Sequence, residues 1–429
     1  MKKSLLLMLA CCSFSAMPIL AHSAEQVELR FAWWGGKARN QATMKALEAF
    51  QAKYPNIKVK AEYTGWDGFY PRLTTQMNSN TEADVIQTNW NWLTLLSKKG
   101  DGFYDLNKLS QPLGLDQYPP EALATTTVNG KINAIPISSN VMLFFYNAAT
   151  WKKAGVEFPK TWDELLATGP VFKEKLGDNY YPLILSEQDA LLMLRSYMYQ
   201  KNQKEMIDEK TKKIAWSHEE LVEALTFYRK LADNHVIPDT KAMASFGKGV
   251  NYEMKPWING EWGGVYNWNV LYTAESQNLK NPSDLVMGPY PMHKDAKDAG
   301  QFRKTALMYS ISRNTKHPQE AAQLLHFLMS ESEGVLPVGL ERGAPLSHDG
   351  EKILRDAGIL KDEDPVIAGL IQSTSMPNKS TASPYLEDPQ FGALFTAARE
   401  SIDHGKATID EAATTFEEQA NRILRRIMR

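Results

Sequence analysis

The chain has 429 residues, of which 43% are hydrophobic, enough to bury two cores of ordinary size. Its 48 basic and 50 acidic side chains give a formal net charge of −2. This balance gives no global argument for a nucleic acid or an anionic membrane as partner, so any electrostatic preference must be local.

The first residues predict an export signal. A basic start at Lys2 and Lys3 is followed by an apolar core and by small residues before Glu25. We therefore expect a cleaved signal peptide over 1–24 and a periplasmic mature chain. A lipid-attachment signal at Cys11 is the alternative. Both cysteines lie within 1–24, so the mature chain would have neither disulfides nor thiol chemistry.

The first third of the chain alternates strand and helix patterns. Leu29–Trp33 predicts a strand, helical spacing up to Phe50 predicts a helix, and Ile57–Val59 and Ala83–Thr88 predict further strands. This βαβ order favours a largely parallel sheet that binds ligands at the carboxyl ends of its strands. The loop after the first strand would lie at that edge, with Asn40 as the N-cap of the next helix.

The middle of the chain is rich in helices, and further strands follow. The expected elements are helices over Trp162–Ala167 and Glu219–Asn234, strands over Trp262–Asn269, Leu285–Met292 and Ala306–Ser312, a helix with Pro318 in its first turn, and helical structure over 388–429. No segment has the composition of a linker. This pattern favours two α/β lobes that are joined by several short crossings of the chain.

Catalytic signatures are missing from the sequence. It has no HExxH, GxSxG, P-loop or GxGxxG motif, and its histidines are scattered without metal-ligand spacing. A carboxylate pair of the glycosidase type is left open, because any chain of this length offers such pairs. We therefore predict no catalytic residue, no metal and no cofactor.

Aromatic and amide residues cluster in the stretches "LRFAWWGGKARN", "TGWDGFYPR", "TNWNWL" and "VYNWNV". Flat rings cover the apolar faces of sugars, while amides form hydrogen bonds with neighbouring hydroxyls. The candidate binding residues are Trp33, Trp34, Trp66, Tyr70, Asn89, Trp90, Asn91, Asn267 and Trp268. For each tryptophan the alternative is burial in a core, which we favour for Trp151, Trp162, Trp216 and Trp257.

These stretches resemble family 1 extracellular solute-binding proteins of ABC transporters, the maltose-binding-like group. The family's start is matched by "FAWWGG" to "ADVIQTNW", and its first crossing between lobes by Ile132–Leu166. Ala306–Ser330 resembles the family's strand and helix after the second crossing, and Val338–Ser347 resembles its third crossing. More narrowly, the chain resembles periplasmic oligogalacturonide-binding proteins. The resemblance implies a two-lobed binding protein with a hinge, no catalytic activity, and a permease pair with an ATPase as partners.

The resemblance also implies lobe boundaries. The expected lobes are 25–138 plus 291–341 and 139–290 plus 342–429, with crossings near Ser138–Val141, Met287–Pro291 and Arg342–Leu346. The first crossing adds Ser138 and Asn140 to the candidate site.

Cations stand where relatives for neutral sugars often have acidic or amide residues. They are Lys37, Arg39, Arg303, Lys304 and Arg342. Converging cations would bind the carboxylates of a galacturonide, although each one alone has a solvated surface charge as its alternative. We therefore expect a monomeric binding protein for digalacturonate or trigalacturonate. The alternatives are a neutral oligosaccharide as ligand and an exported polysaccharide-degrading enzyme.

Overall fold

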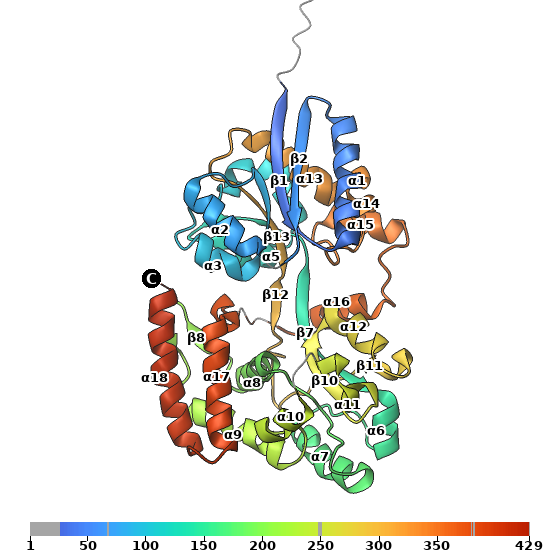
Figure 1. The fold of residues 1–429 in the computed structure, drawn as a ribbon, viewed down its shortest axis with the longest axis vertical. Coiled ribbons are helices and arrows are strands. Elements are labelled where there is room, and N and C mark those ends of the chain that lie inside the picture. The colour runs from blue at the N-terminus through green and yellow to red at the C-terminus, as the bar shows by residue number, and fades with distance from the viewer. Residues whose placement is uncertain (1–25, 67, 248–250, 379, 381, 429) are drawn as a thin grey trace, which may run out of the picture.

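The structure, a computed structural model, describes residues 26–66, 68–247, 251–378, 380 and 382–428. The expected signal peptide over 1–24, Cys11 and the expected start at Glu25 lie outside the described residues. The chain forms two lobes, one above the other in Figure 1, and each lobe is built around its own sheet. The two-lobed α/β fold is thus as the sequence predicts.

The N-terminal lobe, hereafter the N lobe, contains a five-stranded sheet in the order β2-β1-β3-β13-β6. Its strands are β1 (Val27–Trp34), β2 (Ile57–Thr64), β3 (Val85–Asn89), β6 (Ile135–Pro136) and β13 (Leu307–Ile311). Strands β2 and β3 lie parallel to β1, so the carboxyl ends of all three share one edge of the sheet. Strand β13 enters antiparallel at this edge, where Leu307 lies opposite Asn89.

Helices cover both faces of this sheet, as the continuous apolar run of β1 requires. Phe31 and Trp33 pack with α1 and α13, whereas Ala32 and Trp34 face α2. The remaining elements of the lobe are α1 (Lys37–Lys53), α2 (Phe69–Ser79), η1 (Trp90–Trp92), α3 (Leu93–Leu96), η2 (Leu106–Leu109), α4 (Ser110–Leu113), η3 (Leu115–Gln117), α5 (Pro120–Thr125), β4 (Thr127–Val128), β5 (Lys131–Ile132), α13 (Pro318–Ser330), α14 (Ser332–Val338) and α15 (His348–Asp356).

The C-terminal lobe, hereafter the C lobe, is organised around β7 (Ser139–Asn147). Its "VMLFFY" core is almost fully buried, and β10 (Gly264–Trp268), β11 (Leu285–Met287) and β12 (Arg303–Thr305) pair with it antiparallel. The surrounding elements are α6 (Ala148–Ala154), α7 (Trp162–Leu176), α8 (Glu187–Asn202), β8 (Ile207–Asp208), β9 (Lys213–Ile214), α9 (His218–Asp233), α10 (Thr240–Phe246), η4 (Asn251–Glu253), α11 (Lys255–Ile258), η5 (Asn269–Leu271), α12 (Tyr272–Gln277), η6 (Pro282–Asp284), α16 (Pro365–Ser375), η7 (Pro384–Glu387), α17 (Pro389–Asp403) and α18 (Ile409–Ile427).

The crossings between the lobes differ from the expected ones in two places. The first crossing, between β6 and β7, lies at Ser138. The second lies at Ala306, because β12 still pairs with β7 in the C lobe before β13 joins the N-lobe sheet. The third lies within 357–364, because α15 packs on the N lobe and α16 packs on β7 (Figure 1). The observed lobes are therefore 26–138 plus 307–356 and 139–305 plus 365–428.

The expected N-cap at Asn40 is wrong. Helix α1 begins at Lys37, with Gly36 as its N-cap residue. The Asn40 side chain instead accepts a hydrogen bond from Trp33 Nε1 at 2.9 Å and donates one to the Gly35 carbonyl at 3.2 Å. The helix therefore starts within the glycine corner itself, and its first turn lies close to the carboxyl end of β1.

Candidate functional site

A cavity of about 500 Å³ opens at the carboxyl edge of the N-lobe sheet. It is lined by Trp34, Gly35, Gly36, Lys37, Ala38, Arg39, Gly65, Trp66 and Glu341. The β1 end, the start of α1 and the loop after β2 therefore meet here, as expected for a βαβ sheet. Among the stretches singled out from the sequence, "WGGKAR" (34–39) and "GW" (65–66) contribute directly to the lining.

An aromatic cluster forms one wall of this edge. The Trp66 ring is 53% exposed and stacks on Trp92, with ring centroids 5.4 Å apart and an interplanar angle of 26°. Trp34 lies edge-on to Trp66 at 5.2 Å and contacts Phe69 at the same centroid distance. Tyr70 packs on Trp92 at 5.0 Å. The buried rings therefore hold Trp66 in place, with one face free for a flat apolar surface.

Two tryptophans that were expected at the site are buried elsewhere. Trp33 is fully buried in the opposite layer, where its ring stacks on Tyr63. Because successive residues of a strand point to opposite faces, only one of Trp33 and Trp34 can face the Trp66 wall. Trp90 is also buried, and its Nε1 donates to the Thr125 carbonyl at 3.1 Å. Neither ring belongs to the site that we propose.

The remaining tryptophans of this comparison were expected in a core. Trp151, Trp162, Trp216 and Trp257 are all buried in the C-lobe core, as expected.

The N-lobe cations differ in what they already bind. Lys37 is exposed at the first position of α1 and has no ion pair among the described residues. Arg39 donates to the Glu341 carbonyl at 2.9 Å, and burial lowers its pKa, with a further contribution from the nearby charge of Arg342. Both cations line the cavity or its rim, so both can reach an anion held there.

Arg342 has a different role from the one expected. It is 3% exposed, and it donates to Gln87 Oε1 at 2.7 Å and to Thr43 Oγ1 at 2.9 Å. Burial lowers its pKa, and its guanidinium lies 5.7 Å from the Tyr309 ring centroid. The side chain therefore ties the segment after α14 to the N-lobe core, and we leave it out of the proposed site.

Arg72 is a candidate that the sequence reasoning missed. It follows Trp66 and Tyr70 in "TGWDGFYPR" and lies in the first turn of α2. Its guanidinium lies 5.4 Å from the Phe69 ring centroid, and its Nε and Nη2 are buried without a partner in the described structure. Buried donors are normally hydrogen-bonded, so these two atoms are free to take an acceptor that the described residues do not supply.

On the C lobe, the strand register brings three candidates to one face. Lys304 lies opposite Asn140, and Trp268 lies opposite Met142, two residues further along β7. Residues two apart on a strand share a face, so Asn140, Lys304 and Trp268 lie together at the hinge end of the sheet. The Lys304 Nζ is 4.4 Å from the Trp268 ring centroid. The same alternation directs Arg303 to the other face.

Asn267 has a supporting role in the structure. Its Nδ2 donates to Glu275 Oε1 at 2.6 Å, and its Oδ1 accepts from the Trp268 backbone at 2.8 Å. Burial raises the pKa of Glu275 to about 8, against the effect of the Asn267 hydrogen bond. The amide is thus engaged in holding the end of β10, where Trp268 projects.

The remaining candidates lie near the crossing. Ser138 is buried, whereas Asn89 at the end of β3 and Asn91 in η1 are half-buried. Asn91 Oδ1 is buried without a partner in the described part of the chain. In Arg303, the half-buried side chain has no ion pair or hydrogen bond among the described residues, so its guanidinium is available to a ligand.

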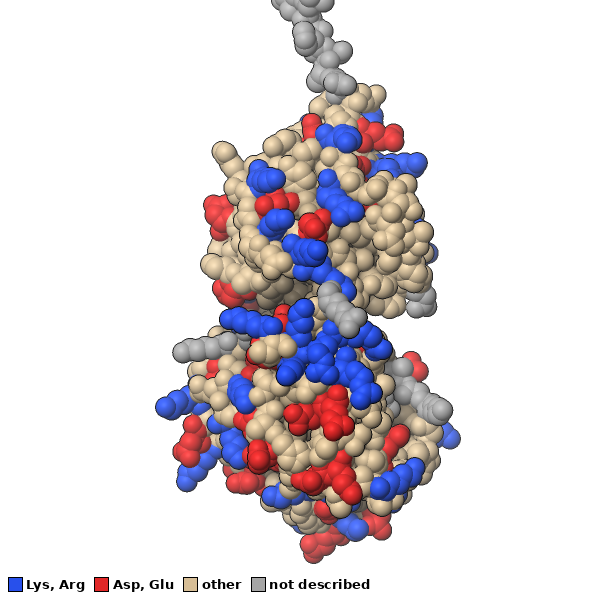
Figure 2. Space-filling model, turned by 90° about the vertical axis from the view of Figure 1, so that its left-hand side faces the viewer, with Lys and Arg blue, Asp and Glu red and all other residues tan. Residues whose placement is uncertain are grey.

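Positive charge gathers near the gap between the lobes. Figure 2 shows Lys and Arg at the end of the C lobe that faces the N lobe. The last turns of α18 reach this end and carry exposed Arg422, Arg425 and Arg426. The β8–β9 hairpin packs on α18 through a hydrogen bond from the Ile214 amide to Asn421. This distribution attracts anions toward the gap, although the whole chain is nearly neutral.

Within the described residues, no group of three or more His, Cys, Asp or Glu side chains could hold a metal ion. No helix in the same part of the chain is long and apolar enough to cross a membrane. The chemistry that the described edge offers is noncovalent: ring stacking, hydrogen bonds from amides, and charge-assisted bonds from cations.

Each lobe pairs a central sheet with covering helices, and the chain crosses between the lobes several times. An aromatic, cation-lined cavity lies at the sheet edge. Together these features define a solute-binding protein. The chain belongs to the bacterial extracellular solute-binding protein family, whose sequence model matches residues 35–335.

The chain is similar to several relatives and solved structures. A periplasmic oligogalacturonide-binding protein from Yersinia enterocolitica is 56% identical, and the match covers 94% of this chain and 100% of that chain. Its structure with saturated digalacturonic acid gives a TM-score of 0.83, and a second structure gives 0.88. A de novo designed cysteine esterase is 55% identical with a TM-score of 0.92, covering 95% of this chain and 100% of that one. An uncharacterised ABC transporter extracellular-binding protein of Pyrococcus horikoshii is 27% identical, covering 72% of this chain and 70% of that protein.

Proposed function

We propose that this chain is the periplasmic receptor of an ABC importer and binds short acidic oligosaccharides, with digalacturonate or trigalacturonate as ligand. It acts by binding alone, as a monomer, and delivers its ligand to a permease pair driven by an ATPase. A signal peptide over 1–24 exports it.

The observation that carries the proposal is the combination of an aromatic wall with cations that lack an anionic partner among the described residues: Lys37 and Arg72 lie on the N lobe, and Arg303 lies on β12 of the C lobe. Trp66 offers a ring face to a sugar. A galacturonate unit needs both features, because its ring has an apolar face and its carboxylate must exchange water for charge-assisted bonds. The 56% identity to a protein with bound digalacturonic acid supports the same ligand class.

We infer that the protein binds its ligand without converting it. Both cysteines of the chain lie within 1–24, so the described residues contain no cysteine that could serve as a nucleophile. A binding protein needs only differential contacts in its open and closed forms.

Hinge closure is the expected motion. The Yersinia structure with digalacturonic acid matches this chain with a TM-score of 0.83 and the second structure with 0.88 at the same identity, which is the kind of difference that a movement between lobes produces. We propose that the crossings at Ser138, Ala306 and 357–364 allow the C-lobe residues Trp268 and Lys304 to approach the Trp66 wall.

A calorimetric titration tests the ligand class. Digalacturonate, galactobiose and maltotriose are added to the mature protein under the same conditions. The proposal expects tight binding of digalacturonate and much weaker binding of the two neutral sugars. Comparable affinity for galactobiose would replace the acidic ligand by a neutral oligosaccharide, and release of monosaccharide or unsaturated product from digalacturonate would show an enzyme instead.

A further inference from the structure

Lys304, a cation that the sequence assigned to the ligand, already has a carboxylate partner. Its Nζ forms an ion pair with Glu387 Oε1, and the two side chains are only 12% and 13% exposed. Glu387 ends η7, more than 80 residues further along the chain. Because so little solvent reaches this pair, water screens the attraction between the two charges far less than in a surface ion pair. The positive charge of Lys304 is therefore largely neutralised by Glu387.

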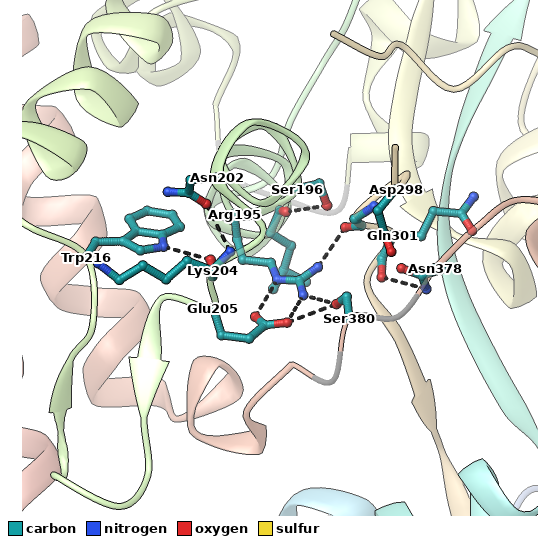
Figure 3. A network of polar contacts seen from close by, with 12 residues as sticks. Arg195, Ser196, Asn202, Lys204, Glu205, Trp216, Asp298, Gln301, Asn378 and Ser380 are labelled. Atoms are coloured by element: carbon teal, nitrogen blue, oxygen red, sulfur yellow. Dashed lines mark hydrogen bonds and ion pairs between the residues drawn. The ribbon is translucent and has the colours of Figure 1, made fainter. Parts of the chain in front are cut away.

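The fold holds the two partners together independently of any ligand. Figure 3 shows Arg195 of α8 at the centre of a polar network, with hydrogen bonds to Ser380 and an ion pair with Glu205. Arg195 Nη1 also donates to the Gly300 carbonyl at 2.6 Å. Asn378 Nδ2 also donates to the Gln301 carbonyl at 3.2 Å. The segments that lead into β12 and into η7 are therefore fastened to each other, which sets Glu387 opposite Lys304.

Arg195 is strongly fixed in this position. It is fully buried, forms an ion pair with Glu205, and lies against the ring of Phe302, the residue two before Lys304. The Phe302 ring in turn meets the Trp268 ring edge-on at 5.7 Å. The Trp268–Lys304 face thus rests on a rigid support.

The Glu387 carboxylate is incompletely satisfied. Its Oε1 binds Lys304, while its Oε2 is buried without a partner within the described structure. A buried carboxylate oxygen without a donor is unfavourable, so the pair is not an optimised structural salt bridge. Its effect is instead to occupy Lys304, whose ammonium lies over the Trp268 ring.

We propose that Glu387 is an internal carboxylate that competes with the carboxylate of the ligand for Lys304 and so limits the affinity of the site for acidic sugars. This inference rests on the proposed function, because it requires a ligand with a carboxylate. A neutral sugar offers the ammonium only uncharged oxygens, which compete weakly with a carboxylate, so its affinity depends far less on Glu387 than the affinity of an acidic sugar does. Glu387 therefore determines how much more tightly the protein binds an acidic sugar than a neutral one.

The test compares Glu387→Gln with the unmodified protein by calorimetric titration with digalacturonate and with its methyl ester. The amide keeps the shape of Glu387 and removes its charge, which frees Lys304 for the ligand. We expect digalacturonate to bind about ten-fold more tightly, as for one added charge-assisted hydrogen bond, and the ester to bind as before. In the double variant with Glu387→Gln and Lys304→Gln, the gain in affinity for digalacturonate should disappear.

Glu157→Gln is the matched control, because Glu157 is an exposed carboxylate of the same lobe. It should leave both affinities unchanged. An unchanged or lowered affinity of Glu387→Gln for digalacturonate would overturn the inference, and so would an equal change for acid and ester. If the unmodified protein and Glu387→Gln both fail to bind digalacturonate, the proposed function itself fails. Melting curves of each variant separate these results from misfolding.

Discussion

Replacing Trp66 by alanine should weaken ligand binding about ten-fold while leaving the protein folded. The ring is 53% exposed, and an indole side chain has roughly 250 Å² of surface, so about 130 Å² is open to solvent. A sugar stacked on the free face would cover about half of that area. At about 25 cal/mol per Å² the lost contact is ~1.5 kcal/mol, which corresponds to roughly a factor of ten in affinity.

Tyr63→Ala provides a matched control for this prediction. Tyr63 is 48% exposed in the same lobe and stacks on Trp33 with ring centroids 5.0 Å apart, much as Trp66 stacks on Trp92. It lines a different cavity, along the outer side of α1. Calorimetric titration should show a loss for Trp66→Ala only, with similar small decreases in melting temperature for both variants. An equal loss of affinity in both, or none in either, would refute the stacking role.

The remaining predictions concern stability, pH and motion. Arg342→Gln should lower the free energy of unfolding by about 2 kcal/mol, because it removes buried hydrogen bonds to Gln87 and Thr43, and denaturant titration measures this loss. The pKa of Glu275 is raised to about 8, from an ordinary value of 4.5. Between these pH values the folded protein keeps a proton that the unfolded chain releases. Glu275 therefore makes the wild type less stable as the pH rises through this range. The melting temperature of Glu275→Gln relative to wild type should therefore increase from pH 5 to pH 8, and a difference independent of pH would contradict this. Small-angle scattering should show a smaller radius of gyration with saturating digalacturonate, whereas an unchanged profile would exclude hinge closure.

The sequence predicted most of the fold because its strands and helices follow simple periodic patterns. The apolar run of β1 and the heptad-like spacing of α9 and α13 are local signals that the structure reproduces within a few residues. The later crossings were misplaced because they depend on long-range pairing. Strand β12 is only three residues long and reads "RKT", so nothing in its own pattern shows that it pairs with β7.

The candidate site was predictable as a region and less so by residue. The glycine corner after β1 was expected at the sheet edge, and Trp66 in the loop after β2 was expected in the binding site, and both line the cavity. The sequence could not decide which of two adjacent tryptophans faces that edge, because this depends on the strand register. It also could not show that Lys304 has Glu387 as a partner, since the two residues meet only through the folding of distant segments.

The central claim is that cations on the facing ends of the two lobes bind the carboxylate of the ligand. The most direct test titrates digalacturonate and its methyl ester into wild type, Arg303→Ala and Lys37→Ala at two salt concentrations. Removal of a true carboxylate partner should weaken binding of the acid by roughly ten- to a hundred-fold and change binding of the ester little. Solvated surface cations would give small, salt-sensitive losses that are equal for the two ligands. If neither variant separates acid from ester, the assignment of an acidic sugar to these cations is contradicted.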